Sequence, residues 1–181
     1  MNAAEGNAAV DVTAAAEPRE RTNNDLTTPI DFLEPLAELG KVYLDPCSNE
    51  WSIVGAEVEL DGSSPERDGL FADWKAIAAG RLVFVNPPYG RGHLRPWARK
   101  IVQAAAAGCE IVVLIPVSPS TLWWQTLRQK ADAMVFLHQR LSFGGGKHGT
   151  GQFDSAAFYF GRRPYLFAHA FQQRGDVVVF R

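Results

Sequence analysis

The sequence predicts an α/β fold: a doubly wound, mostly parallel sheet with helices on both faces. Several predicted strands are apolar throughout, which is typical of strands buried on both faces. These strands alternate with helical segments, the order expected of a parallel or mixed sheet. A chain of 181 residues is long enough for one domain with a substantial core. We therefore expect a single domain over residues 25–181, preceded by a disordered tail over residues 1–24.

Composition supports this division and sets the environment of the protein. Residues 1–24 are rich in Ala, Asn and Glu and hold almost no large apolar side chains, so they cannot bury enough surface to become ordered. The chain is 46% hydrophobic and 21% charged, as is usual for soluble globular proteins. Without a signal peptide or an apolar run near the ~20 residues of a membrane span, we expect a cytoplasmic protein with no membrane partner. Cys47 and Cys109 form no CxxC pair, which favours free thiols, with a disulfide as the alternative.

The first elements follow from capping residues and apolar spacing. Thr28 is a suitable N-cap with Pro29 at the first helical position, and helical apolar spacing predicts a helix over residues 30–39. Residues 42–44 predict a short strand. Residues 51–58 are compatible with either a short helix or a strand.

Glycines and prolines delimit the next elements. The apolar run at residues 82–85 predicts a buried strand, and the Ala-rich stretch over residues 93–107 predicts a helix that ends at Gly108. Residues 111–115 predict another buried strand, which Pro116 ends.

The C-terminal third continues the alternation. Ser118-Pro119-Ser120 predicts the start of a helix that runs to about residue 131, and residues 143–151 form a glycine-rich loop. Further strands are expected at residues 133–137, 156–160 and 177–180.

The most informative motif is Asn86-Pro87-Pro88-Tyr89, directly after the strand at residues 82–85. Neither proline offers a backbone N–H, so the strand ends abruptly and the turn is stiff. An amide and an aromatic ring are thus held at the carboxyl end of a strand, where open α/β sheets bind ligands. Because an amide oxygen accepts a hydrogen bond from an amine while a ring stacks on a flat face, the motif suits a flat group with an exocyclic amine.

Charge divides the chain on either side of this motif. Residues 25–90 hold twelve acidic and four basic side chains, whereas residues 91–181 hold four acidic and twelve basic ones. The basic half could face a polyanion such as nucleic acid. Solvated helix faces would produce the same pattern, so charge alone does not decide between the two.

Several short motifs together resemble a known family, the small phage-type, Dam-like DNA N6-adenine methyltransferases. The resemblance covers residues 25–162, most of the predicted domain. Its pieces, in chain order, are Thr28-Pro29, Leu44-Asp45-Pro46, Asp68-Gly69-Leu70 with Trp74, Val85-Asn86-Pro87-Pro88-Tyr89-Gly90, Val113-Leu114-Ile115-Pro116 and Arg140-Leu141-Ser142-Phe143. The resemblance implies a Rossmann-like class I methyltransferase fold, methyl transfer from S-adenosylmethionine to adenine in double-stranded DNA, and work in the bacterial host cytoplasm if the protein is phage-encoded.

The resemblance also implies a mechanism. An adenine N6 lone pair is delocalised into the ring, and hydrogen bonds from both N6 hydrogens localise it. The family assigns the acceptors to the Asn86 side chain and the Pro87 carbonyl, with Pro88 stiffening the turn and Tyr89 stacking on the base. Since Asn cannot act as a general base, the proton leaves after methyl transfer, to solvent. A base inside a duplex cannot reach such a turn, so base flipping is implied.

Cofactor contacts are implied for two further groups of residues. The resemblance puts Asp45 near the methionine ammonium of S-adenosylmethionine, and Thr28 and Pro29 near the methionine end. It assigns further cofactor contacts to Pro46, Ser48, Asp68, Gly69 and Leu70. Asp68 could instead be only a turn residue before glycine. The loop after Asp45 lacks the glycines found in many methyltransferases, which makes its individual contacts less defined.

Basic residues near the motif are candidates for DNA contact. Arg91 and Arg95 follow the catalytic turn and are expected to hold phosphates, although an ordinary basic helix face is the alternative. Arg140 and Lys147 belong to a glycine-rich stretch whose backbone can approach DNA closely. Target specificity would come from loops around residues 47–66 and 140–152, from the C-terminal segment, or from a second subunit or homodimer.

Other interpretations of the motifs stay open. The same tetrapeptide serves enzymes that methylate RNA guanine amines or protein glutamine, because the target is again a planar nitrogen. A non-catalytic nucleic-acid-binding relic is the alternative from another class. Cys47 is interpreted as a packed thiol rather than a nucleophile. The four histidines show no metal-ligand spacing, so no metal site is predicted.

Overall fold

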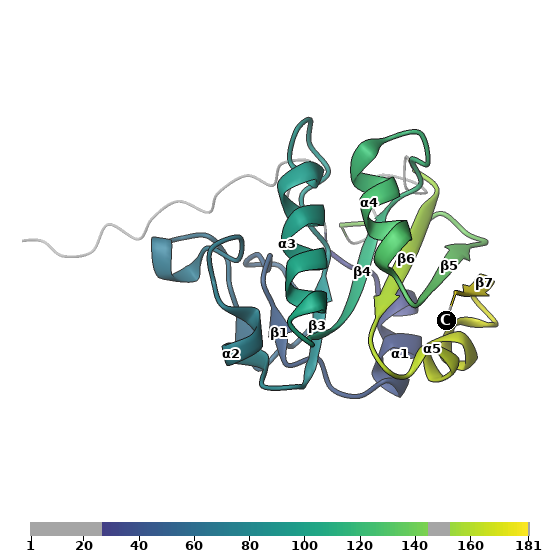
Figure 1. Ribbon diagram of the computed structural model, residues 1–181, viewed down its shortest axis with the longest axis horizontal. Helices are drawn as coiled ribbons and strands as arrows, with labels where there is room; N and C mark the ends of the chain where they lie inside the picture. The colour runs from purple at the N-terminus through teal and green to yellow at the C-terminus, as the bar shows by residue number, and fades with distance from the viewer. Residues whose placement is uncertain (1–26, 145–152, 181) are drawn as a thin grey trace, which may run out of the picture.

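The computed structural model describes residues 27–144 and 153–180 (Figure 1). The tail predicted at residues 1–24 and most of the glycine-rich loop lie outside the described residues. The helices are α1 (Ile30–Glu38), α2 (Trp74–Ala78), α3 (Leu94–Ala106), α4 (Leu122–Lys130) and α5 (Pro164–Phe171), with a 3-10 helix at Pro65–Arg67. The strands are β1 (Leu44–Asp45), β2 (Val58–Glu59), β3 (Leu82–Val85), β4 (Glu110–Pro116), β5 (Ala133–Leu137), β6 (Ser155–Phe160) and β7 (Gly175–Val179).

These strands form one mixed sheet in the order β2-β1-β3-β4-β6-β5-β7. The pairs β2–β1, β1–β3 and β3–β4 are parallel, while β4–β6, β6–β5 and β5–β7 are antiparallel. Five strands therefore point one way, and β6 and β7 point the other way. The prediction of a mostly parallel sheet agrees with the strand directions but is wrong for the pairing beyond β4, because β6 inserts between β4 and β5 in the reverse direction.

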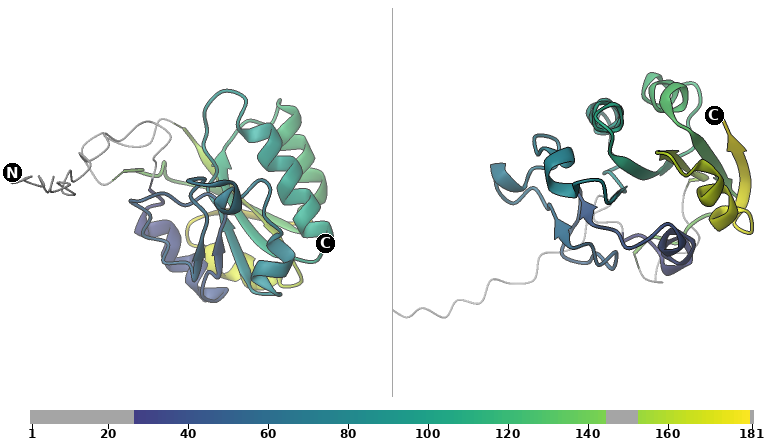
Figure 2. Two further views of the ribbon diagram at one scale, coloured as in Figure 1. Left: turned by 90° about the vertical axis from the view of Figure 1, so that its left-hand side faces the viewer. Right: turned by 60° about the horizontal axis from the view of Figure 1, so that its bottom comes forward.

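Helices cover both faces of the sheet, as predicted. Figure 2 shows α3 and α4 on one side of the sheet and α1 and α5 on the other. In β3, Val83 and Val85 belong to the cluster under α3 and α4, whereas Leu82 and Phe84 belong to the cluster that packs on α1 and α5. Both sets are buried because β3 lies inside the sheet with helices on either side, which explains its uninterrupted apolar sequence.

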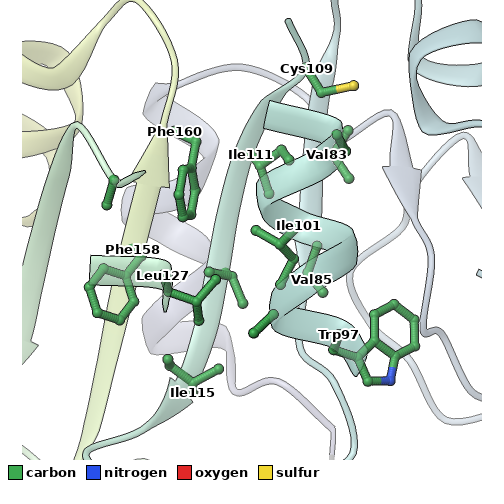
Figure 3. Packing of buried hydrophobic residues seen from close by; sticks show 14 of the residues in the cluster. Val83, Val85, Trp97, Ile101, Cys109, Ile111, Ile115, Leu127, Phe158 and Phe160 are labelled. Atoms are coloured by element: carbon green, nitrogen blue, oxygen red, sulfur yellow. The ribbon is translucent and has the colours of Figure 1, made fainter. Parts of the chain in front are cut away.

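The two clusters are built from interdigitating side chains. On one face, Ile101 and Leu127 from α3 and α4 point toward Ile111 and Phe158 of the sheet (Figure 3). On the other face, the rings of Phe32 and Phe171 join α1 to α5 with their centroids 5.2 Å apart.

Several predicted element boundaries differ from those of the structure. The helix after residue 118 begins at Leu122, because Thr121 rather than Ser118-Pro119-Ser120 provides the cap, its hydroxyl accepting from the N–H of Trp124. The strand predicted at residues 111–115 extends over Glu110–Pro116, and Pro116 ends it as predicted. Between residues 51 and 58, only Val58 belongs to a regular element.

Two α-helices, α2 and α5, were not predicted. Helix α2 is only five residues long, and α5 begins at Pro164, in the half of the chain that was described only by its basic charge. No helix among residues 27–144 and 153–180 is both long and apolar enough to cross a membrane.

Candidate active site

Strands β1, β3 and β4 all end at one side of the sheet, the carboxyl edge. β1 has β2 on one side and β3 on the other, so the order of the strands reverses at this point. Such reversals create a crevice in which α/β proteins bind ligands. Asp45 ends β1 and Asn86 directly follows β3, so the sequence-predicted carboxylate and amide both lie at this crevice.

Thr28 orients the side chain of Asn86. The Nδ2 atom of Asn86 donates a hydrogen bond of 3.0 Å to Oγ1 of Thr28, which is only 3% exposed. The prediction that Thr28 caps α1 is wrong: Pro29 is the cap residue, and no side chain caps this helix. Because its hydroxyl binds Nδ2, Thr28 leaves the amide oxygen of Asn86 directed toward other partners.

Tyr89 occupies the oxygen side of this amide. Its hydroxyl donates to Oδ1 of Asn86 at 2.8 Å and lies 3.3 Å from the carbonyl oxygen of Leu114. Its ring meets Phe143 edge-on, with centroids 5.9 Å apart. Burial raises the pKa of Tyr89 well above its usual value, so the phenol stays a neutral donor. An amide oxygen has two lone pairs, so an incoming amine can share Oδ1 with this hydroxyl or displace it.

Asp45 is a buried carboxylate with no cation bonded to it among the described residues. It is 4% exposed, and its Oδ1 accepts a 3.1 Å hydrogen bond from the backbone N–H of Cys47. Burial raises the pKa of Asp45 to about 7, and the nearby charge of Glu59 adds to the effect. A cationic ligand group beside Asp45 would favour its ionised form.

Cys47 lies next to this carboxylate. Burial and the charge of Asp45 raise the pKa of its thiol well above the usual value. A thiol held in its protonated form is a poor nucleophile, which agrees with a packing role for Cys47.

The turn at Asp68-Gly69-Leu70 packs directly against the end of β1. A side chain at Gly69 would place its Cβ 1.8 Å from the carbonyl oxygen of Pro46, so only glycine allows this approach. The indole Nε1 of Trp74 holds the turn by donating to the Gly69 carbonyl at 2.7 Å. Asp68 accepts from the N–H of Leu70 at 2.9 Å, which is the turn role anticipated as the alternative for this residue.

Unpaired hydroxyls lie in the same region. Among the described residues, the buried side-chain atoms without a hydrogen-bond partner are Oγ1 of Thr27 and Oγ of Ser48 and Ser155. Ser48 is 8% exposed and follows Asp45 in the loop after β1. Buried hydroxyls are normally paired, so unpaired ones beside a buried carboxylate fit a site for a polar ligand.

The candidate DNA-binding residues fall into two groups. Arg91 and Arg95 are exposed after the Asn86–Tyr89 turn and at the start of α3. Arg140 is also exposed, but it pairs with Asp154 at 2.8 Å and lines a cavity of about 240 Å³ beside Pro29. The fourth candidate, Lys147, lies outside the described residues.

Some neighbours of the site were not anticipated from sequence. Phe143, whose ring meets Tyr89, was noted only as part of the motif Arg140-Leu141-Ser142-Phe143, and Ser155, which pairs with Pro116 at the end of β4, stands in no pattern that separates it from ordinary strand positions. Trp74 was noted only as part of the family resemblance, and its bond to Gly69 depends on the tertiary fold. Within residues 27–144 and 153–180, no three His, Cys, Asp or Glu side chains gather in a way that could hold a metal ion.

An oriented amide, an aromatic hydroxyl and a buried carboxylate at the carboxyl edge of a mixed α/β sheet are compatible with the methyltransferase class. The family model for DNA N-6-adenine-methyltransferase (Dam) matches residues 18–159, and the chain therefore belongs to this family. This match confirms the resemblance seen in the short motifs. Among curated proteins, none matches the sequence significantly.

Proposed function

We propose that this protein is an S-adenosylmethionine-dependent methyltransferase that modifies the N6 amine of a flipped adenine in double-stranded DNA. The observation that carries the proposal is the orientation of Asn86: Thr28 binds its Nδ2, so Oδ1 is presented as an acceptor at the carboxyl end of β3. Family membership supports adenine in DNA as the target. The helices on both faces and the reversed strand order support a Rossmann-like, doubly wound methyltransferase domain over residues 25–181.

In this proposal the turn prepares the amine for attack. Oδ1 of Asn86 and the carbonyl of Pro87 accept the two N6 hydrogens, which localises the nitrogen lone pair, while Pro88 keeps the turn rigid. Tyr89 stacks on the base after its hydroxyl leaves Asn86. No described side chain at the turn is suited to act as a general base, so the N6 proton departs to solvent. Catalysis then depends on position and fixed dipoles more than on proton transfer by the protein.

The residues present fit the cofactor. S-adenosylmethionine supplies an activated methyl group on a sulfonium. Asp45 would pair with its ammonium, which relieves the cost of a buried carboxylate, and Ser48 would give its unpaired hydroxyl to a polar group. The remaining proposed contacts come from Thr28, Pro29, Pro46, Asp68, Gly69 and Leu70.

DNA would approach the carboxyl edge of the sheet, where basic residues of the C-terminal half of the sequence are exposed. Arg91 and Arg95 are exposed beside the catalytic turn, where they could bind phosphates flanking the target base. Arg140 would first have to exchange Asp154 for a phosphate. Exposed ion pairs of this kind contribute at most about 1 kcal/mol, so the exchange costs little.

A methyl-transfer assay tests the proposal. We expect wild-type protein to move labelled methyl from S-adenosylmethionine to unmethylated DNA, with N6-methyladenine as the product. Asn86→Ala should abolish transfer while it keeps both the melting temperature and the cofactor affinity close to wild type, because Asn86 lies on the acceptor side.

Other outcomes discriminate among the alternatives. Labelling of RNA or protein but never DNA would reject the substrate assignment while leaving the chemistry intact. Absence of S-adenosylmethionine binding by calorimetry would instead indicate a nucleic-acid-binding relic.

A further inference from the structure

Ser155 is a buried residue whose side chain has no hydrogen-bond partner in the part of the chain that the structure describes. It begins β6, is 1% exposed, and its Oγ makes no hydrogen bond to any described residue. An unpaired buried hydroxyl destabilises the folded state, and alanine would fit the same space without that cost. Ser155 therefore needs a reason other than packing.

The sheet register places Ser155 near the catalytic turn. The hydroxyl of Tyr89 lies 3.3 Å from the carbonyl oxygen of Leu114. Leu114 pairs with Ala157 on β6, and Ser155 pairs with Pro116 two residues further along. With strands ~4.8 Å apart and a rise of ~3.4 Å per residue, the Cα atoms of Leu114 and Ser155 lie roughly 8 Å apart.

Ser155 and Asn86 also share one face of the sheet. Side chains alternate along a strand, and Ala157 and Tyr159 of β6 lie in the cluster that faces α1 and α5, so Ser155 belongs to this face. On β3, Phe84 lies in the same cluster, and Asn86, two residues later, bonds to Thr28 at the start of α1. The unpaired hydroxyl and the oriented amide thus face the same side of the carboxyl edge.

Asn86 follows the Val85–Val113 pair and lies one strand further from Ser155 than Leu114 does, so the Cα atoms of Asn86 and Ser155 lie roughly 12 Å apart, which leaves room for a purine between their side chains. Two hydrogen bonds of about 2.9 Å on either side of a ring system give roughly 8–11 Å between the partner heavy atoms. An adenine whose N6 amine reaches Asn86 still has ring nitrogens that only accept hydrogen bonds. Ser155 can donate to such an acceptor, which the proline carbonyl of the turn cannot do.

We propose that Ser155 is a base-contacting residue whose hydroxyl donates to a ring nitrogen of the target adenine. This inference rests on the proposed function and adds a specificity contact to the same site. In the free protein Tyr89 still binds Asn86 and meets Phe143 edge-on, so we expect the base to displace this aromatic pair before it reaches Ser155.

The first test compares variants on natural DNA. We expect Ser155→Ala to melt at the wild-type temperature or above it, to keep its S-adenosylmethionine affinity, and to lose roughly 5- to 10-fold in kcat/KM for DNA. The control Ser120→Ala removes an exposed hydroxyl from the turn before α4 and should change none of these values. Unchanged DNA kinetics in Ser155→Ala, with an active wild type, would overturn the inference but not the proposed function.

The second test identifies the acceptor with substrates in which the target adenine is 1-deaza-, 3-deaza- or 7-deazaadenine. We expect the kcat/KM of the wild type to fall by a similar 5- to 10-fold on one of these substrates. The kcat/KM of Ser155→Ala on that substrate should be no lower than its value on natural DNA. The contact would be refuted if the wild type were equally active on all three substrates. It would also be refuted if, for each substrate, the loss caused by the deaza base multiplied the loss caused by Ser155→Ala. Inactivity of wild type on every adenine substrate would instead reject the proposed function.

Discussion

Asp45→Asn isolates the cost of burying a charge at the end of β1. Asparagine has nearly the same shape as aspartate, and its Oδ1 can still accept from the N–H of Cys47 as Asp45 does at 3.1 Å. The substitution therefore changes the charge and little else. Because the native pKa of Asp45 is about 7 and its unperturbed value is 3.8, the effect must depend on pH.

The sign and size of the effect follow from proton linkage. Below about pH 4, Asp45 is neutral in both the native and unfolded states and costs nothing. Between pH 4 and 7 the native state keeps a proton that the unfolded chain has lost, so wild-type stability falls as the pH rises. The shift from 3.8 to about 7 corresponds to about 4 kcal/mol, at roughly 1.4 kcal/mol per pH unit. The neutral amide of the variant would carry no such cost, so Asp45→Asn should exceed wild type in stability by up to about 4 kcal/mol at pH 8 and by little at pH 4.

Urea unfolding followed by tryptophan fluorescence at pH 4, 5, 6, 7 and 8 measures this difference without cofactor. Asp61→Asn is a matched control of opposite sign, because hydrogen bonds from Arg67 and Ser63 lower the pKa of the exposed Asp61 carboxyl. That variant should lose stability relative to wild type at neutral pH. If the stability difference between Asp45→Asn and wild type stayed constant from pH 4 to 8, burial would not be what perturbs Asp45.

Three further substitutions test other parts of the structure. Tyr89→Phe keeps the ring and frees Oδ1 of Asn86, so its methylation rate should stay within about threefold of wild type. Tyr89→Ala removes the stacking ring, so its methylation rate should fall 10-fold or more. Equal falls in the rates of both variants would contradict a stacking role. Gly69→Ala forces the carbonyl of Pro46 to move and should raise the calorimetric Kd for S-adenosylmethionine more than 10-fold; an unchanged Kd would remove the 68–70 turn from the cofactor site. Glu110→Ala breaks the bonds from Tyr159 and Arg163 at the opposite end of the sheet, so urea unfolding should show a loss of roughly 1–3 kcal/mol, with kcat/KM unchanged.

The elements that sequence predicted well are those with strong local signals. Residues 82–85 and 133–137 are strands with the predicted bounds, because apolar runs between breakers leave little freedom. Helix α2 was missed because five residues carry too little periodicity, and the reversed direction of β6 leaves no mark in its own sequence. Strand direction depends on connections, which apolar patterns do not encode.

The candidate site was likewise predicted only in part from the sequence. The short motifs around Asp45 and Asn86 identified the family, and the family model agrees with them. The sequence did not reveal that the hydroxyl of Thr28 accepts a hydrogen bond from Asn86 instead of capping α1. Both roles use the same hydroxyl, and only tertiary contacts decide between them. Ser155 gave no signal at all, because a serine at the start of a strand is common and only its missing partner distinguishes it.

The unpaired groups of this protein are concentrated where a ligand would bind. In the part of the chain that the structure describes, Thr27, Ser48 and Ser155 have the unpaired buried side-chain atoms; Ser48 follows β1 and Ser155 pairs with Pro116 at the end of β4, so both lie at the carboxyl edge with Asp45. At the opposite end of the sheet, the buried hydroxyl of Tyr159 is fully engaged with Glu110 and Arg163. Whole domains are stable by only about 5–15 kcal/mol, so several unpaired groups at one edge cost a substantial fraction of that stability. A cofactor ammonium for Asp45 and a base acceptor for Ser155 would each relieve one of these costs, so both ligands should bind more tightly than their contact areas alone suggest.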